Sequence, residues 1–388
     1  MKYKLGSIGY AEAASLACIS VCTNGLFSLD PESAFSFGNT TYLSVPLSCA
    51  LSLAAFLCIS ESMRKCRIGT LFGLFERSFG AFFGAAASLI LCACLLFCAA
   101  VPLKSFALVM RELVYTDADV GTIFFFMMPV VFTLAWMGFE TLGRTAKCYS
   151  IPLTLSLAVL IIISLPRQQS YRLYPVIDGS ITDFMKFSFS ECVYAFTPLS
   201  ALLICGKGMK GERTVKISGA MAAGIAGVIC FAVLFMLARI YTADALCKLF
   251  MPLCRVNYLN AERNYALGAD KLLVMLWVNG CFITAAFCIY SASLLLAQTF
   301  GQRDITPAAA FLSSTVCGIV LYSVKREDET WNALADIFIK YGAAAAVLPQ
   351  LAAALIAWIR RKGIDKENDS SYIGRADADF RDGLPRSL

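Results

Sequence analysis

The sequence predicts an all-α, polytopic membrane protein with about ten transmembrane helices, and three observations support this. Of its 388 residues, 59% are apolar and only 15% are charged, and the mean hydropathy is +0.69. Soluble proteins carry roughly 25% charged residues, so this chain has too few to cover a soluble core of its size. Finally, its apolar runs approach the roughly 20 residues that a helix needs to cross a hydrocarbon layer.

Ten such runs occur in chain order, and the fourth, fifth and sixth are among the shortest. They are residues 8–27, 42–60, 80–103, 121–138, 149–165, 188–205, 217–238, 272–300, 306–324 and 333–358. Lys2 and Lys4 ahead of the first run resemble the start of a secretory signal. Because nine further runs follow, we expect the first to be retained as a membrane helix.

Ten crossings place both chain ends on one side, and the distribution of Lys and Arg predicts which side. If the amino terminus is cytoplasmic, the inner connectors hold 11 basic residues in 45 positions and the outer connectors hold 12 in 94. The density is about twofold higher inside, so both termini are predicted to be cytoplasmic. Residues 1–362 are then the membrane domain, and the polar residues 363–388 are predicted to be a disordered cytoplasmic tail.

Composition also argues against several functions. The chain has no His, the commonest metal ligand and proton shuttle, and shows no carboxylate pair at catalytic spacing, so no enzyme, metal or cofactor is predicted. Its Lys and Arg residues are scattered rather than gathered on one face, which argues against a nucleic-acid partner. Most of the 17 Cys lie inside apolar runs, where a thiol acts as a small hydrophobe.

Two connectors have patterns of their own. Residues 66–79 mix charges with apolar residues at a spacing that predicts a short helix on the inner membrane surface. Residues 240–271 alternate apolar clusters with charges, and the segment is too long for a bare loop. We expect it to fold back over the outer mouth of the bundle.

Four ionisable residues lie in or beside the apolar runs, where a charge is costly and is therefore a candidate functional group. Glu12 is favoured as a carboxylate that reaches the interface or pairs with another helix. Glu140 and Arg144 have the spacing of an ion pair on one helical face, with a structural or gating role. Lys340 is favoured as a partner of Asp336, and a buried cation in a transport path is the alternative. Glu191 is the most informative, because it begins a short run that Thr197 and Pro198 interrupt.

The first run has a similar weak point at Thr23, Asn24 and Gly25. If ten helices divide as five plus five, the first and sixth occupy equivalent positions of an inverted repeat. Interrupted helices at matching positions of such repeats mark a midplane binding site, because their free ends present N–H and C=O groups to a ligand. The sequence therefore predicts broken helices one and six. A packing kink without a binding role is the alternative.

Several segments in order resemble the B subunit of the spore nutrient-germinant receptor, a ten-span branch of the amino acid-polyamine-organocation superfamily. Residues 138–144 with Pro152 resemble its Gly-Ile-Glu segment with a following Arg and Pro, and residues 173–179 resemble its Leu-Leu-Pro-Val-Leu segment. Residues 187–191 match an aromatic run that ends in Glu, and residues 255–277 more loosely match an Arg, Glu-Arg and Trp pattern. The resemblance covers about residues 5–360.

This resemblance implies a spore inner-membrane protein that associates with A and C subunits and senses a small nutrient, commonly an amino acid. Our hypothesis places the nutrient among helices one, three, six and eight, and a permease that transports amino acids is the alternative. The hypothetical ligand-binding residues are Thr23, Asn24, Gly25, Ser190, Glu191, Tyr194, Thr197, Asn279, Thr284 and Tyr290, and Pro198 joins Glu140 and Arg144 as structural or gating residues.

Overall fold

A computed structural model describes residues 7–27, 41–113, 119–173, 180–242, 245–246, 269–302, 304–325 and 329–382. Long helices account for nearly all of this part of the chain, which contains no strand and a single parallel bridge between Ile8 and Met209. The long helices are α1 (Tyr10–Phe27), α3 (Thr41–Lys65), α4 (Leu71–Leu113), α5 (Val120–Met137), α6 (Phe139–Ser164), α7 (Ile181–Ile204), α8 (Glu212–Ile240), α11 (Ala269–Thr299), α12 (Thr306–Lys325) and α13 (Glu329–Asp382).

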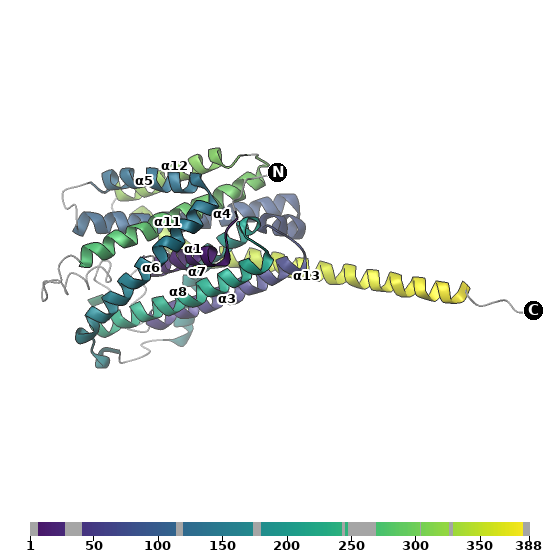
Figure 1. The fold of residues 1–388 in the computed structure, drawn as a ribbon, viewed down its shortest axis with the longest axis horizontal. Coiled ribbons are helices and arrows are strands. Elements are labelled where there is room, and N and C mark those ends of the chain that lie inside the picture. The colour runs from purple at the N-terminus through teal and green to yellow at the C-terminus, as the bar shows by residue number, and fades with distance from the viewer. Residues whose placement is uncertain are drawn as a thin grey trace, which may run out of the picture.

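These ten helices match the ten predicted runs in order, so the predicted helical membrane architecture is confirmed. Eight of them are long and apolar enough to cross a membrane, and α12 supplies a shorter apolar stretch, Thr306–Leu321. The remaining helix, α1, has 18 residues. Figure 1 shows the helices packed side by side in one bundle, with α1 and α7 near its middle.

Burial separates an inner from an outer set of helices. In the most apolar 18-residue stretch of α7 and of α11, 89% of the residues are buried. The corresponding share is 22% in α6 and 33% in α5. The outer helices instead expose large apolar side chains, such as Phe126 and Ile151. In a lipid environment such side chains need no protein cover. Helices α7 and α11 are therefore central, and α1 packs against both.

Two glycines with positive φ set the helix geometry at one end of the bundle. Gly80 (φ 83°) kinks α4, so residues 71–79 form the short helix that the sequence predicts. Its apolar residues Leu71, Leu74 and Phe75 are fully buried against the bundle. Gly138 (φ 92°) joins α5 directly to α6. The predicted connector at residues 139–148 is therefore wrong, because a glycine at positive φ redirects the chain without a loop.

The predicted breaks in helices one and six are not present as backbone interruptions. Helix α1 continues through Thr23, Asn24 and Gly25 to Phe27, and α7 continues through Pro198 to Ile204. Neighbouring helices allow a membrane helix to tolerate Gly and Pro without unwinding. At these two positions the structure instead buries polar side chains completely, namely Thr23, Asn24 and Thr197.

One end of the bundle collects several chain segments, and we call it the Ile8 end. There the Ile8 N–H donates to the Gly208 carbonyl at 3.0 Å, just after α7. Arg360 of α13 donates to the Arg77 carbonyl of α4 at 2.5 Å. Beyond this point α13 continues to Asp382 and projects from the bundle in Figure 1. The helix α13 thus includes residues 363–382, and the disordered cytoplasmic tail stays a prediction. The domain boundary at residue 362 stays a prediction, and most of the segment 240–271 lies outside the described residues.

Candidate functional site

Three polar side chains near the middle of the bundle are fully buried without a hydrogen-bond partner in the part of the chain that the structure describes. They are Thr23 and Asn24 of α1 and Thr197 of α7, each 0% exposed. Both amide atoms of Asn24 and the two threonine hydroxyls are affected. A buried polar group left without a partner costs about 1–3 kcal/mol. All three belong to the segments that the sequence singles out as weak points.

The register of α1 and α7 places these groups at a similar depth. The two helices are joined at the Ile8 end, where Ile8 pairs with Met209. Thr23 and Asn24 lie 15 and 16 residues after Ile8, and Thr197 lies 12 residues before Met209. The contact of Cys205 at the end of α7 with Ser291 in α11 (3.5 Å) supports this register, because eight residues earlier it sets Thr197 level with residue 283 of α11, about 5 Å along that helix from Gly280. A hydrocarbon layer is roughly 30 Å thick and takes about 20 helical residues to cross, so these groups lie deep within the membrane.

Helices α4 and α11 complete the surroundings of this polar cluster, which we define as Thr23, Asn24 and Thr197. The Thr23 hydroxyl lies against Gly280 of α11, where an added Cβ would come within 3.2 Å of it. The Cys98 thiol of α4 is a weakly polar neighbour of the Thr197 hydroxyl, but the two do not have the geometry of a hydrogen bond. Since α1, α4, α7 and α11 are helices one, three, six and eight of the predicted order, the structure brings together the four helices of the hypothesis.

Gly25 allows α1 to pack closely against α3 and α8. A Cβ there would lie 3.4 Å from the Cys230 sulfur of α8 and 3.5 Å from Val45 of α3. Small residues at such points let membrane helices approach closely.

The other predicted α7 residues face different neighbours. Ser190 donates its hydroxyl to the Lys186 carbonyl of its own helix at 3.0 Å. The Tyr194 ring packs against Phe338 of α13, with centroids 6.0 Å apart. Glu191 is buried, at 4% exposure.

The predicted α11 residues also separate. Asn279 is half-buried next to Gly280, whereas Thr284 donates to the Gly280 carbonyl at 2.8 Å. Tyr290 stacks on Phe139 at 6.2 Å, beside the Gly138 hinge. It lies ten residues beyond Gly280, about 15 Å along the helix, so it is distant from the polar cluster.

Sequence reasoning missed a buried cation at the level of Glu191. Lys104 of α4 is only 5% exposed, although the sequence places it in an outer connector. Helices α4 and α7 are antiparallel and meet where Cys98 lies beside Thr197. Six residues along each helix from this contact, α4 reaches Lys104 and α7 reaches Glu191. A buried cation and a buried carboxylate therefore share one level of the bundle.

The remaining ionisable candidates have structural surroundings. Glu12 accepts a hydrogen bond from the Gly9 N–H at 2.9 Å and lies 3.9 Å from the Lys147 ammonium. Glu140 and Arg144 form the predicted ion pair on an exposed helical face. The Lys340 ammonium lies 5.4 Å from the centre of the Tyr341 ring, and its expected partner Asp336 has a side chain outside the described set.

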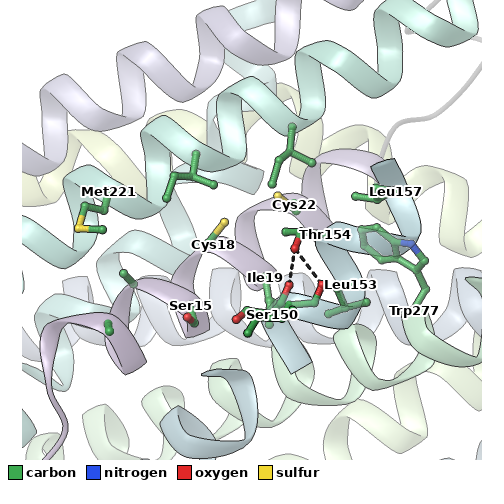
Figure 2. Close-up of a pocket in the computed structure, with 15 residues that line it drawn as sticks. Ser15, Cys18, Ile19, Cys22, Ser150, Leu153, Thr154, Leu157, Met221 and Trp277 are labelled. Carbon is green, nitrogen blue, oxygen red and sulfur yellow. Dashed lines mark hydrogen bonds between the residues drawn. The ribbon is translucent and has the colours of Figure 1, made fainter. Parts of the chain in front are cut away.

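Beside the polar cluster lies an apolar cavity of about 280 Å³ between α1, α6, α8 and α11. Figure 2 shows Cys18 and Cys22 of α1, Thr154 of α6 and Trp277 of α11 around it. Thr154 uses its hydroxyl within α6, on the carbonyls of residues 150 and 151. None of the predicted site residues lines this cavity, and its apolar walls suit a hydrocarbon chain better than a charged nutrient.

Comparison with known proteins identifies the family. A family model described as spore germination protein matches residues 16–329. The chain belongs to this spore germination family. No curated protein matches it.

Solved structures that share this fold include transporters. A sodium-coupled sialic acid symporter, in a substrate-bound outward-open state, has a TM-score of 0.67 and 12% identity over 91% of this chain and 89% of that one. MhsT in complex with L-phenylalanine has a TM-score of 0.64 and 12% identity over 92% of this chain and 89% of that one. Mhp1, a nucleobase-cation-symport-1 family transporter, has a TM-score of 0.59 and 11% identity over 94% of each chain. The spore germination chain therefore has the five-plus-five inverted-repeat fold of these transporters.

Proposed function

We propose that this spore germination protein is the nutrient-sensing membrane subunit of a germinant receptor and that it binds an amino acid at the polar cluster. The observation that carries the proposal is the set of buried, unpartnered groups on Thr23, Asn24 and Thr197. They supply hydrogen-bond donors and acceptors deep in the membrane, where an amino acid needs both. Membership of the spore germination family and a fold shared with the L-phenylalanine-bound MhsT support this class of ligand.

In this proposal the ligand carboxylate binds donors on α1, and its ammonium binds acceptors on α7. Asn24 offers an amide N–H, and Thr197 offers a hydroxyl oxygen. Pro198, the next residue, has no N–H and so adds no donor to this acceptor side of the site. Asn279 of α11 contributes from the neighbouring wall. Ser190 and Thr284 are not among the proposed ligand-binding residues, because their hydroxyls already donate hydrogen bonds within their own helices.

Complete burial of the cluster links binding to signalling. Because the three side chains are 0% exposed, a ligand reaches them only when the helices around them separate. A ligand shifts a conformational equilibrium only by its difference in affinity for the two states. Here the state that admits the ligand differs in helix packing from the closed state. Partner subunits that contact these helices can detect the difference. A few kcal/mol would shift the equilibrium by two or three decades.

The cellular setting is inferred from the family and the charge distribution. We place the protein in the spore inner membrane, with A and C subunits as partners and both termini in the cytoplasm. The Ile8 end is then the cytoplasmic end, in agreement with the basic residues Lys147 and Lys207 near it. Reporter fusions at residues 207 and 361 test this topology. Reporters on opposite sides of the membrane would exclude it.

A working amino acid transporter is the second candidate, favoured by the fold of its structural neighbours. The same site serves both functions, so a sensor and a transporter differ only in the events after the ligand has bound. Purified protein in sealed vesicles separates them. A sensor binds labelled amino acid without accumulating it, whereas a transporter accumulates it without A or C subunits.

The site is tested by nutrient dose response in spores that carry Thr197→Val. This substitution keeps the shape of the side chain and removes its buried hydroxyl. We expect the nutrient concentration for half-maximal germination to rise about tenfold or more, because a hydrogen bond to a charged group contributes about 1.5–3 kcal/mol. Ser190→Ala on the same helix is the matched control and should leave the response unchanged. An unchanged response of Thr197→Val spores at normal protein level would contradict the site.

A further inference from the structure

A second pocket, at the Ile8 end, combines basic and apolar walls. Its volume is about 240 Å³, and it lies between the α3–α4 connector and the α7–α8 connector. Arg64 and Lys207 line it on the polar side. Apolar side chains line the rest, namely Met63, Ile68, Leu203, Met209 and Val215. A site with this composition matches a molecule that has a charged head and an apolar body.

The surroundings of the pocket carry an excess of positive charge. Residues 61–70 and 205–216 together contain seven basic and two acidic residues, a formal net charge of +5. The Glu61 carboxylate forms ion pairs with three of these cations. Its carboxylate lies 2.6 Å from Arg64, 3.2 Å from Lys216 and 3.7 Å from Lys65. No described side chain forms an ion pair with Lys207. The pocket thus offers a cation whose charge the described protein does not balance.

Backbone geometry holds Lys207 at this position. It lies in the short 3-10 turn Gly206–Gly208, between α7 and α8. Its stem crosses Gly69 of the opposite connector so closely that a Cβ there would lie 3.3 Å from the lysine Cε. Arg67 in the same connector has a positive φ of 53°, which is uncommon for a residue other than glycine. The stem of the exposed lysine therefore packs against the opposite connector at Gly69.

The apolar side of the pocket favours a lipid over a soluble anion. Five apolar side chains line it, and they offer inorganic phosphate no hydrogen-bond partner. Basic connectors at the end of a membrane bundle also attract anionic headgroups. We propose that the pocket binds an anionic phospholipid, with the headgroup at Arg64 and Lys207 and the start of an acyl chain against the apolar side chains. The inference does not rest on the proposed nutrient site.

The test uses the purified full-length protein in detergent and measures lipid affinity by native mass spectrometry. The probes are phosphatidylglycerol and phosphatidylcholine with identical acyl chains, with inorganic phosphate as a soluble competitor. We expect selective binding of phosphatidylglycerol. Lys207→Gln should weaken it about fivefold at low salt, which corresponds to ~1 kcal/mol for one basic residue near an anionic headgroup. The control Lys186→Gln changes a lysine on α7 that pairs with Asp183, and it should leave the affinity unchanged.

Three results would overturn the inference. Equal affinity for both phospholipids would show that the charge of the headgroup is not recognised. An unchanged affinity in Lys207→Gln would place the lipid elsewhere. Displacement of phosphatidylglycerol by millimolar inorganic phosphate would identify a site for soluble anions. Because the Lys207 side chain is exposed, its replacement is not expected to impair folding.

Discussion

Replacement of Asn24 should stabilise the protein in the absence of nutrient, the reverse of the usual effect of changing a buried residue. The Asn24 side chain is 0% exposed, and its amide nitrogen and oxygen have no partner among the described residues. Leucine has the same branching at Cγ and carries no polar atom. Asn24→Leu therefore removes a desolvation cost of about 1–3 kcal/mol. It also replaces a poorer helix former with a better one, worth about 0.5 kcal/mol.

The assay is reversible unfolding of the purified protein in mixed micelles, with the free energy of unfolding compared between variants. We expect Asn24→Leu to raise this free energy by about 1–3 kcal/mol. Asn24→Ala adds no volume and controls for overpacking, so it should be at least as stable as the wild type. Ser20→Ala provides the opposite case on the same helix. Ser20 is equally buried, but its hydroxyl donates to the Leu16 carbonyl at 2.9 Å. Its loss should lower the free energy by about 1 kcal/mol.

The reasoning fails if both Asn24 variants are destabilised as much as Ser20→Ala. That result would mean that the amide has satisfied partners and contributes to folding, and the argument for a ligand site on α1 would be lost. A stable Asn24 variant that no longer responds to nutrient is the predicted combination. Proteins commonly retain destabilising groups where binding requires them.

Two further predictions concern helix packing. Gly219→Ala on α8 should lower the free energy of unfolding by about 1–3 kcal/mol, because its Cβ would collide with the buried Phe56 ring of α3. Gly224→Ala on the same helix meets nothing within 4 Å and should be neutral or stabilising, so equal effects of the two would contradict the α3–α8 contact. Lys104→Met or Glu191→Gln alone should cost about 3–5 kcal/mol, because each leaves a buried charge at one level of the bundle without its opposite. The double variant should recover most of this loss, and additive losses in unfolding measurements would show that the two charges do not interact.

Hydropathy alone predicts the number and order of the helices, because each membrane crossing needs its own long apolar run. It does not predict how glycine and proline act within those helices. Gly138 replaces an expected ten-residue connector, whereas Gly25 and Pro198 leave their helices intact. The difference depends on neighbours, since a helix packed on all sides keeps its shape even where a proline removes one backbone hydrogen bond.

The sequence also does not predict which buried polar side chains find a hydrogen-bond partner. Thr23, Asn24 and Thr197 are recognisable as polar residues in apolar runs, but only packing shows that they lack partners while Ser190 and Thr284 have them. Lys104 is missed because Pro102 and a charge together suggest the end of a helix, yet α4 continues to Leu113. Its burial depends on α7, whose position no local pattern specifies.

Equilibrium binding of labelled amino acids to the purified protein tests the central claim most directly. The comparison is between the wild type and the combined variant Thr23→Val, Asn24→Leu and Thr197→Val, with folding of the variant checked by thermal unfolding. We predict saturable binding of at least one amino acid to the wild type and a loss of more than a hundredfold in affinity in the variant, since each lost hydrogen bond to a charged group contributes about 1.5–3 kcal/mol. Equal affinity of the two folded proteins would show that the nutrient does not bind at the polar cluster.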